Sequence, residues 1–282
     1  MLKYAVVLGL LVSIPAFARP VPTASEVLAK ASGLVMEEKQ DDRPLAFDWS
    51  GVVAMPGCSG SVVSFGQPDT AKAIVMTNGH CIGMLDGPAA AVLVNQPYRA
   101  NISFFVDQTR KIQGRVTKIT YGILMPHDVA WLETDKTYGE LAAQGVKARK
   151  ISARMADIGT SIAIPSGYWS RLYSCKIEKI IHEVREAEYV NLQSYKYHCE
   201  TIHGTSGSPI IDVATNEVVG VNYTGNDDGE QCTFNNPCEV DEQGNITVEE
   251  GANYGDQVYK VMACLNSAKD LDLSAPGCKL PR

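Results

Sequence analysis

The stretch HGTSGSP, residues His203–Pro209, places a serine among small residues directly before the apolar run IIDV. Glycine, threonine, serine and proline together are typical of a turn that precedes a strand. A turn is therefore the structural interpretation, and it requires no chemistry. The functional interpretation makes Ser206 a nucleophile, which requires a histidine and a carboxylate elsewhere in the chain that can reach it.

Two further stretches supply these groups. In AIVMTNGHCI an apolar run is followed by His80, and in PHDVAWLE Asp128 opens another apolar run. Histidine suits general-base work because its unperturbed pKa is about 6.5. A carboxylate beside such a run is expected to be partly buried and hydrogen-bonded. We therefore predict a triad in which His80 takes the proton of Ser206 while Asp128 orients the imidazole.

These stretches resemble the sequence blocks of trypsin-like serine proteases. TNGHC resembles their TAAHC block, HDVAWL resembles NDIALL, and GTSGSP resembles GDSGGP. CSGS at residues 58–61 is similar to the CGGSL block, and GVNYTG is similar to GIVSWG. The order histidine, aspartate, serine is that of chymotrypsin and differs from the orders in subtilisins and α/β-hydrolases.

The resemblance implies an all-β fold of two packed antiparallel six-stranded β-barrels. His80 and Asp128 would come from the first barrel and Ser206 from the second. It also implies an oxyanion hole formed by the backbone N–H groups of Gly204 and Ser206.

A disulfide between Cys58 and Cys81, beside the histidine, is a further implication of the resemblance. The chain has eight cysteines, an even number that favours disulfides in an exported protein. We expect a local Cys232–Cys238 bridge in the polar loop NDDGEQCTFNNPCEVDEQGN. No pair of CxxC motifs indicates a zinc site, and neither a metal nor a cofactor is expected.

Four residues near Ser206 and on the GVNYTG run are predicted to determine substrate specificity. The resemblance implies that Glu200, six residues before Ser206, occupies the position of the pocket base in trypsin, which predicts a preference for Lys and Arg before the cut. Thr201, Tyr223 and Gly225 are predicted wall or substrate-strand positions.

Two residues depart from the trypsin pattern. Thr205 replaces the aspartate of GDSGGP that pairs with a new N-terminal amine when trypsin-like zymogens are activated, so we predict that this switch is not used. GTSGSP is closer to the bacterial glutamyl-endopeptidase branch. That branch carries a histidine on the substrate strand where this chain has Asn222, so glutamate specificity is not expected.

Short β-rich runs separated by turn residues begin near Phe47 and predict the all-β fold. We expect a first barrel over about 47–140, a helical connector near YGELAAQGVKAR and a second barrel over about 150–250. Val258, Val261, Met262 and Leu265 follow i, i+3, i+4, i+7 spacing, which predicts a C-terminal α-helix over about 255–270.

The N-terminal region has a different composition. Residues 1–18 combine a lysine, an apolar run and Ala-Phe-Ala, which predicts a secretory signal peptide, with an uncleaved anchor as the alternative. Residues 19–46 are interpreted as a pro-segment or N-terminal extension. We accordingly expect a secreted protein, extracellular or periplasmic, with no membrane segment after cleavage.

The composition and net charge of the chain limit its possible partners. The chain has 282 residues, 45% apolar content and a formal net charge of −7, which gives no support to nucleic-acid binding. We predict a monomeric serine endopeptidase acting on protein or peptide substrates. The alternative is a catalytically inactive homologue that binds a partner through the same cleft. Among the other histidines, His127, His182 and His198 are expected at the surface, and His203 is a candidate cleft residue.

Overall fold

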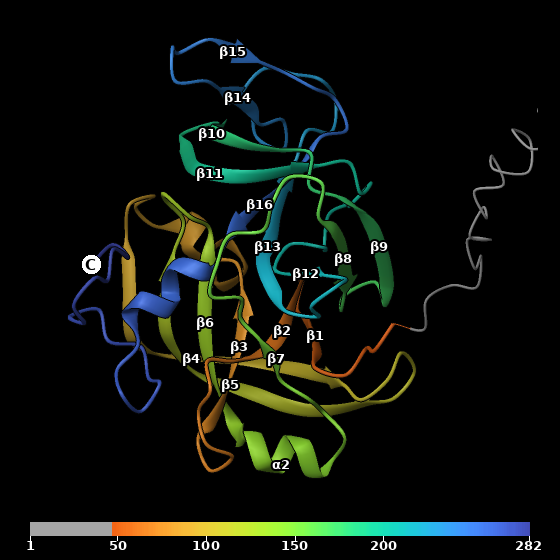
Figure 1. Cartoon of the computed structure of the whole chain (residues 1–282), viewed down its shortest axis with the longest axis vertical. Coiled ribbons are helices and arrows are strands. Elements are labelled where there is room, and N and C mark those ends of the chain that lie inside the picture. Colours follow the sequence, from red (N-terminus) through yellow and green to blue (C-terminus); the bar gives the residue numbers. More distant parts are fainter. Residues whose placement is uncertain (1–46) are drawn as a thin grey trace, which may run out of the picture. The chain divides into compact units, whose positions relative to one another are not determined.

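The computed structural model describes residues 47–282, so the predicted signal peptide and pro-segment lie outside the described residues. The described chain forms one seven-stranded and one nine-stranded sheet, which confirms the all-β, chymotrypsin-like fold class. Figure 1 shows the first sheet in orange to light green and the second in green to blue. Residues 47–282 contain no helix long and apolar enough to cross a membrane.

The first sheet closes into a barrel because β1 pairs with both β4 and β2. Its strands are β1 (Val52–Met55), β2 (Cys58–Ser64), β3 (Lys72–Thr77), β4 (Val92–Phe105), β5 (Lys111–Ile123), β6 (Val129–Thr137) and β7 (Arg149–Lys150). Valine and phenylalanine side chains such as Val62, Val75 and Phe104 are fully buried inside it. The core therefore follows from the β-branched and aromatic runs that predicted the strands.

The second sheet curls back because β9 leads after two residues into β10, which lies near the other end of the same sheet. Its strands are β8 (Ser161–Ser166), β9 (Arg171–Lys176), β10 (Lys179–Glu186), β11 (Tyr189–Tyr197), β12 (Pro209–Asp212), β13 (Val218–Gly225), β14 (Cys238–Val240), β15 (Ile246–Thr247) and β16 (Asn253–Gln257). Ile164, Tyr195 and Ile210 are completely buried in its core. The two sheets have seven and nine strands, more than the six per barrel that the resemblance implied. β7, from the connector, is the extra strand of the first sheet, and β14 and β15, in and just after the polar loop, are two of the three extra strands of the second.

The predicted C-terminal α-helix is wrong. Residues Asn253–Gln257 form strand β16 between β11 and β13, and only Tyr259–Cys264 are helical, as the 3-10 helix η3. A 3-10 helix has three residues per turn, which agrees with burial of Val258, Val261 and Cys264. Cys264 is bonded to Cys278, so the chain turns back where the apolar pattern would have continued a helix.

The connector between the barrels carries the predicted helix, α2 (Tyr138–Ala143), which begins with a capping box made by Thr137 and Glu140. After α2, β7 pairs in parallel with β2, and Ile151 then bridges to Val218 on β13. The connector is therefore hydrogen-bonded to both sheets.

The eight cysteines all lie within the described residues and form four disulfides. The bridges are Cys58–Cys81, Cys175–Cys199, Cys232–Cys238 and Cys264–Cys278. The third of them closes the polar loop that precedes β14.

Candidate active site

His80 and Asp128 are brought together by the pairing of β3 with β6. Thr77 at the end of β3 pairs with Ala130, so the residues after β3 lie beside those before β6. His80 Nδ1 lies 2.5 Å from Asp128 Oδ2, and the His80 backbone N–H donates to Asp128 Oδ1 at 3.1 Å. Asp128 is only 4% exposed. Both carboxylate oxygens are therefore engaged by the same histidine.

This contact determines the state of the imidazole. Because Nδ1 faces the carboxylate, the neutral ring carries its proton there and keeps a lone pair on Nε2. Burial by itself lowers the pKa of His80, but the charge and hydrogen bond of Asp128, with the charge of Glu186, raise that pKa above its usual 6.5. The ring is therefore a stronger base than a free histidine.

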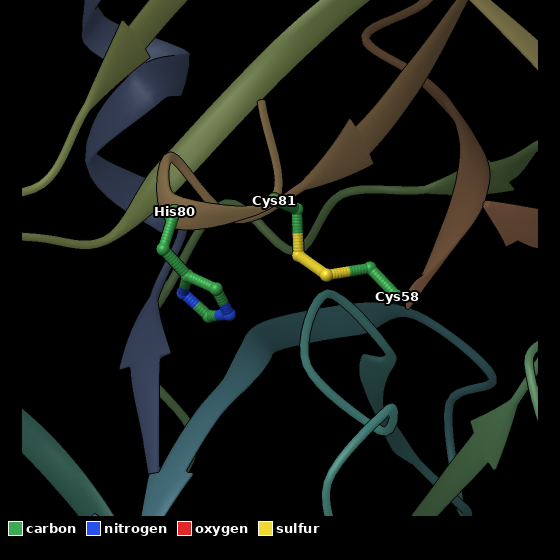
Figure 2. A group of neighbouring side chains, drawn as sticks. All are labelled: Cys58, His80 and Cys81. Atoms are coloured by element: carbon green, nitrogen blue, oxygen red, sulfur yellow. A yellow bond between two sulfur atoms is a disulfide. The ribbon is translucent and has the colours of Figure 1, made fainter. Parts of the chain in front are cut away.

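The Cys58–Cys81 disulfide lies beside the same ring (Figure 2). The two sulfurs and a His80 nitrogen lie within 4.8 Å of one another, close enough to resemble a metal site. Both sulfurs are consumed in the disulfide, however, whereas a zinc site uses thiolates. The bridge joins β2 to the residue after His80 and so restrains the turn that carries the imidazole.

Ser206 lies at a point where the two barrels touch. Its carbonyl accepts the N–H of Ser59 on β2 at 2.8 Å. Gly207 has φ +81°, and a Cβ there would lie 2.1 Å from the Ser59 carbonyl oxygen, so only glycine fits. The Ser206 hydroxyl donates to the Tyr223 carbonyl at 3.4 Å, a long hydrogen bond.

The loop over residues 202–208, here called the Ser206 loop, presents two unused donors. Gly204 has φ +89°, a left-handed conformation that glycine adopts readily. The Thr205 N–H donates to the Ile202 carbonyl at 3.0 Å, whereas the N–H groups of Gly204 and Ser206 have no acceptor among residues 47–282. Gly204 and Ser206 both line the same cavity as His80.

That cavity has a volume of about 330 Å³ and lies between the ends of both barrels. It brings together all four residues predicted for the triad and the oxyanion hole: His80, Asp128, Gly204 and Ser206. A base, a hydroxyl and two free N–H donors around one space can support acyl transfer.

The sequence itself matches a known family over this region. The sequence pattern of the trypsin-like peptidase domain matches residues 58–221, more than half of the chain, including His80, Asp128 and Ser206. The chain belongs to the trypsin-like peptidase family. Curated protein sequences give no significant match to this peptidase domain.

Several solved structures are similar to this chain. The active form of the Rv3671c protease from M. tuberculosis is 17% identical, covers 98% of this chain and 97% of its own, and has a TM-score of 0.44. The MamO protease domain from Magnetospirillum magneticum is 12% identical, with coverages of 78% and 98% and a TM-score of 0.47. A Glu endopeptidase is 17% identical, with coverages of 74% and 85% and a TM-score of 0.45.

Thr205 and Asn222 form an uncharged network in this peptidase domain. Thr205 is buried, and its hydroxyl donates to the Ile202 carbonyl at 2.5 Å and accepts from Asn222 Nδ2 at 3.3 Å. Asn222 Oδ1 in turn accepts from the Tyr197 hydroxyl at 2.8 Å. The Ser206 loop is thus tied to β13 and β11 by neutral hydrogen bonds at the position where trypsin has an aspartate.

Of the four predicted specificity residues, three line the cavity and one does not. Thr201, Tyr223 and Gly225 line the cavity. Tyr223 also stands at a bulge in the pairing of β13 with β16, which re-aims its backbone. Glu200 is exposed, has φ +56° and is not among the residues that line the cavity, so its assignment to the pocket base is wrong.

A further carboxylate of the cavity lining, besides Asp128 and Asp227, is Glu186 at the end of β10, which sequence reasoning missed. It accepts the Asn235 N–H at 2.7 Å and is hydrogen-bonded by Thr224. Burial raises the pKa of Glu186, which the Thr224 and Asn235 hydrogen bonds and the His80 charge only partly offset. No lysine or arginine of the described chain forms an ion pair with it. No local signal in REAEY distinguishes this glutamate from its neighbours.

A second missed residue is Asp256 on β16, which is completely buried. Its Oδ2 accepts the backbone N–H of Asp128 at 2.5 Å, across the two barrels. His127 faces the other carboxylate oxygen at 3.5 Å and contacts Lys260 Nζ at 3.2 Å. The expected surface position of His127 is therefore wrong, since it is 7% exposed and packs against this buried acid.

The remaining histidines lie near their expected places. His182 is exposed, and His198 is half-buried between Glu178 and Glu249. His203 lines the cavity, as the sequence suggested, and its Nε2 lies 2.7 Å from Asp227 Oδ2.

Proposed function

We propose that this peptidase domain is a secreted serine endopeptidase in which Ser206 is acylated by the substrate. The observation that most directly supports this function is the His80–Asp128 pair. It leaves the imidazole Nε2 available beside the cavity that Ser206 also lines. The four disulfides support export, because such bridges persist in oxidising compartments.

Acylation begins with a change of hydrogen-bond partner. The Ser206 hydroxyl leaves the Tyr223 carbonyl and donates to His80 Nε2, which takes its proton as the oxygen attacks the scissile carbonyl. Catalytic hydrogen bonds are often long before substrate binds, so the present 3.4 Å contact is compatible with this step. Asp128 stabilises the imidazolium that forms.

The negative charge then develops on the carbonyl oxygen. The N–H groups of Gly204 and Ser206 donate to it, and losing one such donor costs about 2.7–4 kcal/mol in the barrier. His80 gives its proton to the leaving amine, which leaves an ester on Ser206. Water, deprotonated by the same histidine, hydrolyses this ester and restores the enzyme.

Labelling with a fluorophosphonate probe tests this proposal. The mature protein should be labelled at Ser206, and His80→Ala and Ser206→Ala should abolish labelling while leaving the thermal unfolding midpoint nearly unchanged. Absence of labelling in correctly processed protein would support the alternative of a catalytically inactive homologue that binds partners through the cleft. The hydrogen bond from Ser206 to Tyr223, rather than to His80, is the observation that favours this alternative.

We further propose that substrates with a basic side chain near the cut are preferred, through Glu186 rather than Glu200. Glu186 is a half-buried carboxylate in the cavity wall, and ionising it there is costly because burial raises its pKa. A lysine or arginine of the substrate offsets that cost by pairing with the carboxylate.

Glu186→Gln should lower the kcat/KM ratio of basic over uncharged substrates by about tenfold or more, because one partner of a desolvated charge pair is lost. Glu200→Gln is the matched control, since this exposed glutamate lies outside the cavity lining, and its ratio should stay as in the wild type. Profiling with a peptide library measures both ratios. Equal ratios in wild type and Glu186→Gln would refute the assignment.

A further inference from the structure

The turn between β8 and β9, residues 167–170, lies against the Ser206 loop. Trp169 is 49% exposed, yet its indole Nε1–H donates to the His203 carbonyl at 2.6 Å. Tyr168 and Trp169 pack edge to face, with ring centroids 4.8 Å apart. A Cβ at Gly204 would lie 2.7 Å from Tyr168 and 2.9 Å from Trp169 Nε1, so the two rings cover this glycine closely.

The hydrogen bond to His203 determines where the Gly204 N–H points. The His203 carbonyl and the Gly204 N–H belong to one planar trans peptide and point in opposite directions. While Trp169 holds the carbonyl on its side, the N–H faces the other way. A flip of this peptide would break the indole hydrogen bond and replace the donor with a carbonyl oxygen.

The next peptide is held by Ser59, a completely buried residue of β2. Its hydroxyl donates to the Gly204 carbonyl at 2.9 Å and accepts the Tyr168 N–H at 3.1 Å. A hydroxyl has one proton to donate, so its contact with Ser166 Oγ at 3.1 Å is accepted rather than donated. One hydroxyl thus joins the first barrel, the turn and the Ser206 loop.

The turn itself is held against the first barrel. A Cβ at Gly167 would lie 2.0 Å from the Val53 carbonyl oxygen on β1, and Trp169 N–H donates to Ser166 Oγ at 3.2 Å. Trp169 is therefore presented from a backbone that packs closely on its neighbours, although its ring is half exposed.

We propose that Trp169 is a positioning residue that keeps the 203–204 peptide with its N–H toward the cavity. This rests on the proposed function, in which that N–H stabilises the oxyanion. Thr205 forms only neutral hydrogen bonds, so the orientation does not depend on an ion pair. The indole N–H and the Ser59 hydroxyl hold the two peptides on either side of Gly204.

Two replacements isolate the indole N–H. Trp169→Phe removes it together with one ring, and incorporation of 3-benzothienylalanine at this position removes it with the two-ring shape preserved. Both should lower kcat about 10- to 100-fold with KM within about twofold, because the donor acts on the transition state. Affinity for a peptide aldehyde inhibitor should fall in parallel with kcat.

A crystal structure of Trp169→Phe gives a readout that does not require activity. The 203–204 peptide should be inverted or present in both orientations. An unchanged peptide together with unchanged kcat in both variants would overturn the inference. A wild type that neither cleaves peptides nor reacts with the probe, combined with an inverted peptide in the variant, would contradict the proposed function and still support the role of Trp169.

Discussion

Two acidic neighbours raise the pKa of His80. Asp128 supplies a charge and a hydrogen bond, and Glu186, another residue of the cavity lining, adds a charge. The raised pKa of His80 has a cost, because the imidazole is protonated, and so inactive as a base, over a wider range of acidic pH. The same neighbours that stabilise the imidazolium in the reaction thus narrow the pH range of activity.

The acid limb of kcat/KM should therefore have its midpoint above pH 6.5. Only neutral His80 accepts a proton, so activity falls as the pH drops through the raised pKa. Asp128→Asn should reduce kcat by about 10⁴-fold. Glu186→Gln should move the midpoint downward, because a charge that raises the pKa of His80 is removed. A wild-type midpoint below 6.5 would contradict this account.

At the scale of elements, the Ser206 loop combines glycine geometry with neutral hydrogen bonds. Gly204 uses a left-handed conformation, and Thr205 is fixed by Ile202 and Asn222. Hydrogen bonds from β2, from β13 and from the β8–β9 turn all hold this loop in place. Its shape therefore depends on several neutral hydrogen bonds rather than on one charge.

Two substitutions in this loop should differ strongly. Gly204→Pro removes the N–H and cannot adopt φ +89°, so kcat should fall by about 10²-fold or more. Thr205→Ala loses two neutral hydrogen bonds and should lower kcat by less than about tenfold. Steady-state kinetics on folded variants measures both. A complete loss of activity in Thr205→Ala would show that this residue controls the oxyanion hole after all.

Sequence reasoning found the elements whose signal is local. The strands around His80, Asp128 and Ser206 have apolar runs next to turn residues, and α2 has its capping box. It missed β16, since NYGDQ has no alternating pattern and its Asp256 is buried through tertiary contacts. Glu186 was missed because its role depends on which strand end reaches the cavity, and Trp169 because its role depends on how the β8–β9 turn packs against the Ser206 loop.

At the scale of the whole catalytic unit, hydrogen bonds cross from one barrel to the other beside the site. Ser59 N–H donates to the Ser206 carbonyl, and Asp128 N–H donates to Asp256 Oδ2. Burial raises the pKa of Asp256, and the hydrogen bonds from His127 and Asp128 offset this only in part. The ionised acid therefore orients Asp128 at some cost in stability.

Asp256→Ala should lower the free energy of unfolding by about 1–3 kcal/mol, because it leaves the Asp128 N–H buried without an acceptor. Asp256→Asn keeps an acceptor and should cost much less. Since the pKa of Asp256 is raised on folding, wild-type stability relative to Asp256→Asn should decline as the pH rises from 3.8 through the folded pKa. Urea unfolding in a Ser206→Ala background, which prevents self-cleavage, measures this. Equal losses for the two variants would show that the hydrogen bond is unimportant.

The connector that pairs with β2 through β7 and with β13 through Ile151 also constrains motion. A segment that is hydrogen-bonded to both barrels is a poor hinge, because moving the barrels apart would break its backbone pairing with at least one of them. We therefore expect the cavity between the barrels to keep nearly the same width when a substrate binds.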